Sequence, residues 1–260
     1  MKEKYKIFDA HAHYDDDEFS KDRDSVIKDL KKNKILGVIN CGASLKTSVQ
    51  SVELANIYDF FYAAVGVHPE NSMEVNEETL EKIESLTKNK KVKAIGEIGL
   101  DYYYKENPDK NIQIDGFRKQ MALAQKLDLP VVIHDRDAHL DTLNIIKEFP
   151  KVKGEVHCFS GSVEFARQCI DLGYYIGVTG VITFKNAKKV IEVVKDIPLD
   201  RILVETDCPY MAPVPLRGKR NRSEYIKYMI DKIAEIKELD SETVSDQILK
   251  NIENLFNISV

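Results

Sequence analysis

The chain has 260 residues, close to the roughly 250 that one eight-fold α/β barrel needs. Its composition, 43% hydrophobic and 31% charged with no Trp, is that of an ordinary folded protein and excludes a disordered or fibrous chain. The net charge of -5 argues against a protein that coats long nucleic-acid duplexes through a basic surface. Any nucleic acid is therefore expected to be bound locally.

Two features of the chain concern its compartment. Residues 1–5 lead into an apolar, strand-like run without the apolar core of a signal peptide, and no later stretch is long enough to span a bilayer. The cysteines are far apart and form no CxxC pair: Cys41, Cys158, Cys169 and Cys208. We therefore expect a cytoplasmic protein in a reducing compartment, with no membrane partner and no obligate protein partner.

Short β-branched or aromatic runs alternate with longer amphipathic segments along the chain, which is typical of βα units around a parallel sheet. Eight strands are expected, at Lys6 to His11, Ile35 to Cys41, Phe60 to Val67, Val92 to Ile98, Pro130 to His134, Gly154 to His157, Tyr174 to Val178 and Ile202 to Thr206. Helical spacing of apolar residues predicts a helix over Ile114 to Leu127, and Gly173 is expected to end another helix. A last helix, Ser241 to Phe256, is expected to pack across the outside of the barrel. The sequence thus predicts a single (β/α)8 TIM-barrel domain over residues 1–260.

Histidines and carboxylates follow several of these strands at their carboxyl ends. The loops at those ends form an open mouth, where barrel enzymes place their catalytic groups. His11 and His13 are two residues apart on a strand and share a face, so one metal ion could bind both imidazoles. Further candidate ligands at other strand ends are Glu97, His134, His157 and Asp207. Because imidazoles and carboxylates are ligands of divalent metals, the sequence predicts a metal centre.

Each candidate also has a structural interpretation when it is taken alone. A single His at a strand end is more often a hydrogen-bonded structural residue, and Glu97 or Asp207 could cap a helix or form an ion pair. Delivery of such residues to one rim by five different strands favours the metal centre. Cys158 and Cys208 are expected to pack rather than bind metal, because adjacent residues on a strand face opposite ways. Lys93 is expected to lie too deep to bridge metals.

Seven motifs resemble those of the TatD-type deoxyribonucleases, a branch of the amidohydrolase-like metal-dependent hydrolases. They are Asp9-Ala10-His11-Ala12-His13, Gly66-Val67-His68-Pro69, Gly96-Glu97-Ile98-Gly99-Leu100-Asp101-Tyr102-Tyr103, Ile133-His134-Asp135-Arg136-Asp137-Ala138, His157-Cys158-Phe159-Ser160-Gly161, Glu205-Thr206-Asp207-Cys208-Pro209-Tyr210 and Arg217-Gly218-Lys219-Arg220-Asn221. The resemblance covers essentially the whole chain. One departure follows Asn221, where the family often has Glu-Pro and this chain has Arg222-Ser223-Glu224.

The resemblance implies two divalent metal ions, Mg²⁺, Mn²⁺ or Zn²⁺, and a set of roles. His11 and His13 would hold one ion, and His134 and His157 the other. Glu97 would bridge the ions, and Asp207 would bind the pair and orient or deprotonate the attacking water. Glu205 would support catalysis. The implied reaction is the removal of nucleotides from a 3′ end of DNA.

Candidate substrate-binding residues surround the expected mouth. The basic loop after the eighth strand could neutralise phosphates or could be an ordinary solvated loop; its cations are Arg217, Lys219 and Arg220. His68 could also contact phosphate, whereas His139 is expected to be an ordinary surface residue. The run Tyr102 to Tyr104 could stack on an unpaired base or pack in the core.

The shape of a barrel mouth favours one reading of the substrate. A concave cup admits a strand end more easily than the middle of a duplex, so we expect an exonuclease acting on single-stranded DNA or at a strand end. One alternative is a C–N or carboxylic-ester hydrolase that uses the same metals on a small molecule. Another is a non-catalytic nucleic-acid-binding barrel, which the presence of all six candidate ligands disfavours.

Overall fold

A computed structural model of the protein describes residues 5–260. Residues 1–4, part of the segment expected to lack a signal peptide, lie outside the described residues. Among the described residues, no helix combines the length and the apolar character that crossing a membrane requires.

Eight parallel strands form one sheet in the order of the sequence, β1 to β8. A bridge between Ala12 and Cys208 brings the ends of β1 and β8 together, and the N–H of Asp207 donates to the carbonyl of His11 at 2.9 Å. The sheet is therefore a nearly closed barrel, as predicted. The strands are β1 (Phe8–Ala12), β2 (Gly37–Cys41), β3 (Phe61–Val65), β4 (Val92–Asp101), β5 (Val131–Arg136), β6 (Gly154–Val156), β7 (Tyr175–Val178) and β8 (Ile202–Val204).

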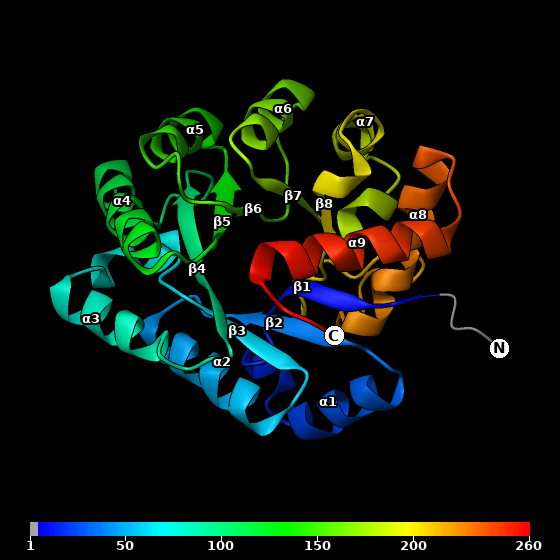
Figure 1. Cartoon of the computed structure of the whole chain (residues 1–260), viewed down its shortest axis with the longest axis horizontal. Coiled ribbons are helices and arrows are strands. Elements are labelled where there is room, and N and C mark those ends of the chain that lie inside the picture. The colour runs from blue at the N-terminus through cyan, green and yellow to red at the C-terminus, as the bar shows by residue number, and fades with distance from the viewer. Residues whose placement is uncertain (1–4) are drawn as a thin grey trace.

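Helices surround the strands in chain order, from α1 to α8 (Figure 1). All residues of β1 and β2 are buried, because one face of the sheet fills the barrel interior and the other packs on helices. The helices are α1 (Arg23–Lys32), α2 (Leu45–Ile57), α3 (Glu77–Leu86), α4 (Lys110–Leu127), α5 (His139–Glu148), α6 (Val163–Asp171), α7 (Lys188–Asp196), α8 (Ile226–Lys237) and α9 (Ser241–Phe256).

Two strands extend further toward the mouth than expected. The expected ends were Ile98 and His134, but β4 continues to Asp101 and β5 to Arg136, because Gly99, Leu100 and Asp101 pair with the last residues of β5. In contrast, β6 and β8 end at Val156 and Val204, earlier than expected.

The helix predicted over Ile114 to Leu127 was confirmed, with an earlier start. The helix α4 begins four residues earlier than expected, at Lys110, because the Asp109 side chain accepts the N–H of Asn111 at 2.9 Å and caps it. Phe117 and Met121 form part of its buried face. Gly173 follows α6 with a φ of 88°, the left-handed conformation that glycine tolerates after a helix.

The last helix has the predicted bounds, Ser241–Phe256. Its Asn251 side chain donates to the carbonyls of Leu199 and Ile202 at 2.9 and 2.8 Å, before and at the start of β8, and its Ser245 hydroxyl accepts the N–H of Lys6 at 2.7 Å, before β1. The helix α9 therefore packs across the outside of the barrel at its amino-terminal end, in front of the strands in Figure 1. Lys93 donates to the carbonyl of Asn257 at 3.3 Å at this same end, which confirms that it lies far from the mouth.

Candidate metal centre

Four predicted ligands surround one point at the carboxyl end of the barrel. Nε2 of His11 lies 3.0 Å from Nε2 of His13. Oε2 of Glu97 lies 3.4 Å and 3.5 Å from these nitrogens, and Oδ1 of Asp207 lies 3.7 Å and 3.3 Å from them. The four atoms come from β1, β4 and the segments that follow β1 and β8.

These separations fit a bound cation. Ligand atoms about 2.1 Å from a tetrahedral metal ion lie about 3.4 Å from one another. The observed separations of 3.0 to 3.7 Å match that geometry without movement of the side chains. Two imidazole nitrogens facing each other inside the protein also need a shared proton or cation between them. The donor set is therefore suited to a divalent metal.

The other carboxylate oxygen of Glu97 faces a second group of imidazoles. Its Oε1 lies 2.8 Å from Nδ1 of His134, 3.2 Å from Nε2 of His157 and 3.6 Å from Nε2 of His68. Glu97 is 4% exposed and lies between the two groups, with one oxygen toward each. This is the placement that a carboxylate bridging two cations requires.

The electrostatics of the cluster favour ionised carboxylates. Burial alone would raise the pKa of Glu97, but the imidazoles of His157, His68 and His11 hold it well below its ordinary value. Burial would also raise the pKa of Asp207, but the hydrogen bond from His13 and the nearby imidazoles lower it below its ordinary value. Asp207 also adopts a left-handed backbone with a φ of 53°, an uncommon conformation for a non-glycine residue that concentrates at functional sites.

Asp101 is a site residue that the sequence analysis did not single out. Its Oδ2 lies 3.0 Å from Nε2 of His134, whose other ring nitrogen faces Glu97. A carboxylate that accepts the N–H of one ring nitrogen fixes the tautomer and leaves the other nitrogen free to bind metal. Asp101 lies within the Gly96–Tyr103 motif, but its place at the mouth depends on the extension of β4 beyond the expected end.

Asp9 was also missed as a structural anchor below the ligands. The buried carboxylate accepts the N–H and the hydroxyl of Thr206 at 2.9 and 2.6 Å and the hydroxyl of Ser223 at 2.6 Å. These bonds join β1 to the segment after β8 and to the stretch that departs from the family pattern. They fix the relative positions of His11 and Asp207.

Glu205 lies behind His157 and inside the barrel. Its Oε1 lies 3.3 Å from Nδ1 of His157 and accepts the N–H of Cys158 at 2.5 Å. Glu155, the middle residue of β6, is fully buried beside Glu205 and was not anticipated. Burial, followed by repulsion from Glu205, raises the pKa of Glu155 well above its ordinary value. These contacts make Glu205 a positioning group for His157.

His68 lies closer to the centre than the sequence suggested. Its Nδ1 accepts the N–H of Glu70 at 3.2 Å, which leaves the proton of the neutral ring on Nε2. Burial lowers its pKa to about 3, so the ring stays neutral. His68 therefore presents a hydrogen-bond donor toward Glu97 and the metal cluster.

The basic loop contains two kinds of cation. Arg220 binds Asp22 through both terminal nitrogens, at 2.8 and 2.6 Å, and its guanidinium lies over the ring of Phe19. The guanidinium of Arg217 lies 4.3 Å from the ring centroid of Phe184, and within residues 5–260 no carboxylate forms an ion pair with it. Together with Phe184 and Tyr210, the loop lines a cavity of about 430 Å³ at the mouth side of β8. Three cations of the loop line this cavity: Arg217, Lys219 and Arg220.

Other predicted side chains lie outside the centre. Cys158 and Cys208 belong to none of the candidate ligand groups found among residues 5–260, as expected. His139 is half-buried and not simply a surface residue: its Nδ1 lies 2.8 Å from Oδ2 of Asp135, and its ring stacks on Phe165.

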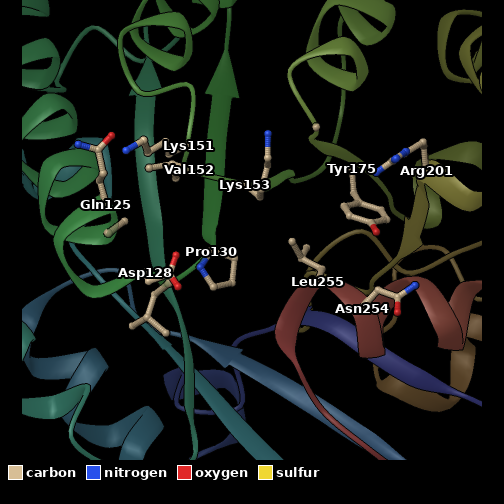
Figure 2. Close-up of a pocket in the computed structure, with 13 residues that line it drawn as sticks. Gln125, Asp128, Pro130, Lys151, Val152, Lys153, Tyr175, Arg201, Asn254 and Leu255 are labelled. Atoms are coloured by element: carbon tan, nitrogen blue, oxygen red, sulfur yellow. The ribbon is translucent and has the colours of Figure 1, made fainter.

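A second cavity, of about 570 Å³, lies at the amino-terminal end of the barrel (Figure 2). Residues that precede or begin β5 to β8 line it, with Leu255 of α9; Tyr175 and Arg201 lie across it from Gln125 and Lys151 in Figure 2. None of its lining residues belongs to the metal cluster. Barrel chemistry takes place at the opposite end, so this cavity is not the candidate active site.

The family described as TatD related DNase matches residues 8–257. The chain belongs to the TatD family of metal-dependent hydrolases. It is 44% identical to a Bacillus subtilis protein named as the uncharacterised metal-dependent hydrolase YabD, covering 97% of this chain and 100% of that protein. It is 32% identical to the 3′-5′ ssDNA/RNA exonuclease TatD of Erwinia tasmaniensis, covering 97% of this chain and 100% of that protein.

Solved structures agree with this assignment. The TatD homologue YJJV of Escherichia coli superimposes with a TM-score of 0.90 at 31% identity, covering 97% of this chain and 98% of that one. A phosphotriesterase homology protein of Escherichia coli, at 16% identity and a TM-score of 0.68, shares the fold. This TatD-family protein is thus a metal-dependent hydrolase on a (β/α)8 barrel, with its candidate ligands at the barrel mouth.

Proposed function

We propose that this protein is a 3′-5′ exodeoxyribonuclease that uses two divalent metal ions, Mg²⁺, Mn²⁺ or Zn²⁺, and acts on single-stranded DNA or at a strand end. The observation that carries the proposal is the position of Glu97, with one oxygen toward each of two imidazole groups at an open barrel mouth. The similarity to the Erwinia 3′-5′ ssDNA/RNA exonuclease supports a nucleic-acid substrate. The acidic net charge of -5 supports local rather than extended binding of DNA.

Six side chains would hold the ions: His11, His13, Glu97, His134, His157 and Asp207. When bound, a metal pair supplies a nucleophilic water at neutral pH and stabilises charge on the entering and leaving oxygens of a phosphodiester. The protein fixes the geometry through the contacts of Asp101 and Glu205 with two of the imidazoles.

The remaining groups would act on water and substrate. Asp207, ionised beside His13, accepts a proton from the attacking water and orients it. His68 donates the hydrogen on Nε2 to a phosphate oxygen. Arg217 and Lys219 bind backbone phosphates through the loop after β8. Arg220, paired with Asp22, fixes the loop in place and makes a weaker contact with phosphate than Arg217 and Lys219.

Residues 1–260 would work as one domain, without an obligate protein partner. The four cysteines are free thiols, three of them buried. Free thiols are stable in a reducing compartment, which supports a cytoplasmic location.

Comparison of substrate classes tests the reaction type. The metal-loaded protein is assayed with bis-p-nitrophenyl phosphate, with a lactone and with an aryl amide, each beside the Glu97→Gln variant. The proposal expects hydrolysis of the phosphodiester that depends on Glu97. Hydrolysis of the lactone or amide alone would instead identify a carbonyl hydrolase that uses the same centre.

A further inference from the structure

Two exposed tyrosines and an arginine form an aromatic surface beside the metal centre. Tyr103 and Tyr104 follow β4 and are 55% and 47% exposed, with ring centroids 4.9 Å apart and rings nearly perpendicular. Arg136, the last residue of β5, places its guanidinium 4.1 Å from one ring centroid and 4.9 Å from the other. We call Tyr103, Tyr104 and Arg136 the aromatic platform.

The platform is not part of the core. Tyr102, which precedes it, is the packing member of the run: it is half-buried, its hydroxyl donates to Asp141 at 2.8 Å, and Lys110 lies over its ring. Burial of an aromatic ring stabilises a fold, so two adjacent rings left half in water contribute little to stability here. Their exposure beside a catalytic mouth is typical of a ligand contact.

A single carboxylate connects the platform to the metal centre. Asp101 Oδ1 accepts the N–H of Tyr103 at 2.9 Å and that of Tyr104 at 3.4 Å, while Oδ2 lies 3.0 Å from His134. Arg136 follows His134 by two residues on β5. The rings are therefore held at a fixed position next to a candidate metal ligand.

The barrel order places the platform opposite the basic loop. The strands β4 and β5 lie halfway around an eight-strand barrel from β8 and β1. A DNA strand whose backbone phosphates were bound by Arg217 and Lys219 would cross the candidate metal centre toward the platform. Its terminal base, beyond the scissile phosphate, would then reach Tyr103 and Tyr104.

We propose that the aromatic platform binds the unpaired base of the terminal nucleotide by stacking, with Arg136 adding a cation–π contact. This inference rests on the proposed nuclease function and names its substrate contact. Stacking on an aromatic ring accepts any base, because every base has a π face, and removal of such a contact weakens binding about tenfold. The larger purines are bound more tightly than pyrimidines.

The test compares two single-stranded oligonucleotides that differ only in the terminal nucleotide, which carries adenine or is abasic. The measured quantity is the ratio of kcat/KM values for release of that nucleotide by the metal-loaded protein. The wild type is expected to have a kcat/KM about tenfold higher for the adenine oligonucleotide, and this difference is expected to come from KM. Tyr103→Ala/Tyr104→Ala is expected to bring the ratio near one, whereas Tyr103→Phe/Tyr104→Phe, which keeps both rings, retains the preference. Equal loss on both oligonucleotides, with the ratio preserved, overturns the inference.

Failure of the nuclease proposal is recognised separately. In that case the metal-loaded wild type cleaves neither oligonucleotide, and fluorescence of a terminal 2-aminopurine decides on the platform. Quenching by the wild type and the Phe variant but not by the Ala variant supports base stacking. Equal fluorescence with all three proteins overturns it.

Discussion

Oδ2 of Asp101 lies 3.0 Å from Nε2 of His134, on the side of the imidazole that faces away from Glu97. The contact assigns Nδ1 of His134 to the metal-facing position. A buried acceptor of this kind orients a ligand ring and raises its basicity, and its loss weakens metal binding about 10- to 100-fold.

We therefore expect Asp101→Asn to weaken the binding of one metal ion per chain by about 10- to 100-fold while the other is retained. Competition with a coloured chelator measures this directly. Asp141→Asn is the matched control, because the Asp141 carboxylate accepts a hydrogen bond from the Tyr102 hydroxyl and not from an imidazole of the centre. Equal metal affinity in both variants would show that His134 does not depend on Asp101.

Asp207→Asn is expected to lower kcat at least about tenfold at an unchanged melting temperature, because it removes a metal-facing carboxylate and the proton acceptor together. Asp137→Asn serves as the control for the loss of one charge. Asp137 also has a left-handed backbone, but it is exposed and follows β5. Wild-type turnover by Asp207→Asn would contradict the proposed role of this residue.

His68→Ala is expected to lower kcat/KM by about 10- to 100-fold with two metal ions still bound. In the proposed arrangement the Nε2–H of His68 donates to the substrate and not to a metal site. Because this nitrogen also lies 3.6 Å from Oε1 of Glu97, a role as metal ligand has to be tested separately. Metal content by atomic emission, measured with activity, separates the two roles. A fall to one bound ion would make His68 a ligand instead of a phosphate contact.

Lys219→Ala is expected to reduce the slope of log binding constant against log salt concentration for single-stranded DNA by about 0.7, the value of one lost phosphate contact. Arg220→Ala should change the slope less, since Asp22 already neutralises its charge. Lys90→Ala, before β4 at the amino-terminal end of the barrel, provides the control. If Lys219→Ala and Lys90→Ala give the same slope, the basic loop does not contact phosphate.

The fold was predictable from the sequence because each strand and helix carries its own local signal. The alternation of β-branched runs with amphipathic segments identified all eight strands, and the apolar spacing of Ile114 to Leu127 identified α4. The strand ends were less accurate, since the extension of β4 to Asp101 depends on pairing with β5, which is a contact between segments distant in sequence.

The sequence predicted the ligands of the candidate metal centre but not the residues that support them. Residues two apart on a strand share a face, which brought His11 and His13 together, and barrel topology brought the other ligands to the same rim. Asp9 and Asp101 lie within motifs that the sequence shows, but their supporting roles depend on contacts across the barrel that a local pattern does not reveal. The position of α9 at the amino-terminal end depends likewise on tertiary packing.

The most direct measurement is the release of nucleotides from end-labelled single-stranded DNA by protein stripped of metal and then resupplied with Mg²⁺, Mn²⁺ or Zn²⁺ in turn, with Glu97→Gln in parallel. The proposed mechanism predicts no cleavage by the stripped protein, stepwise shortening from the 3′ end after resupply, and no shortening by the variant. DNA that stays intact under all three metals, while two ions per chain are bound, would contradict the nuclease function and leave a hydrolase of small molecules.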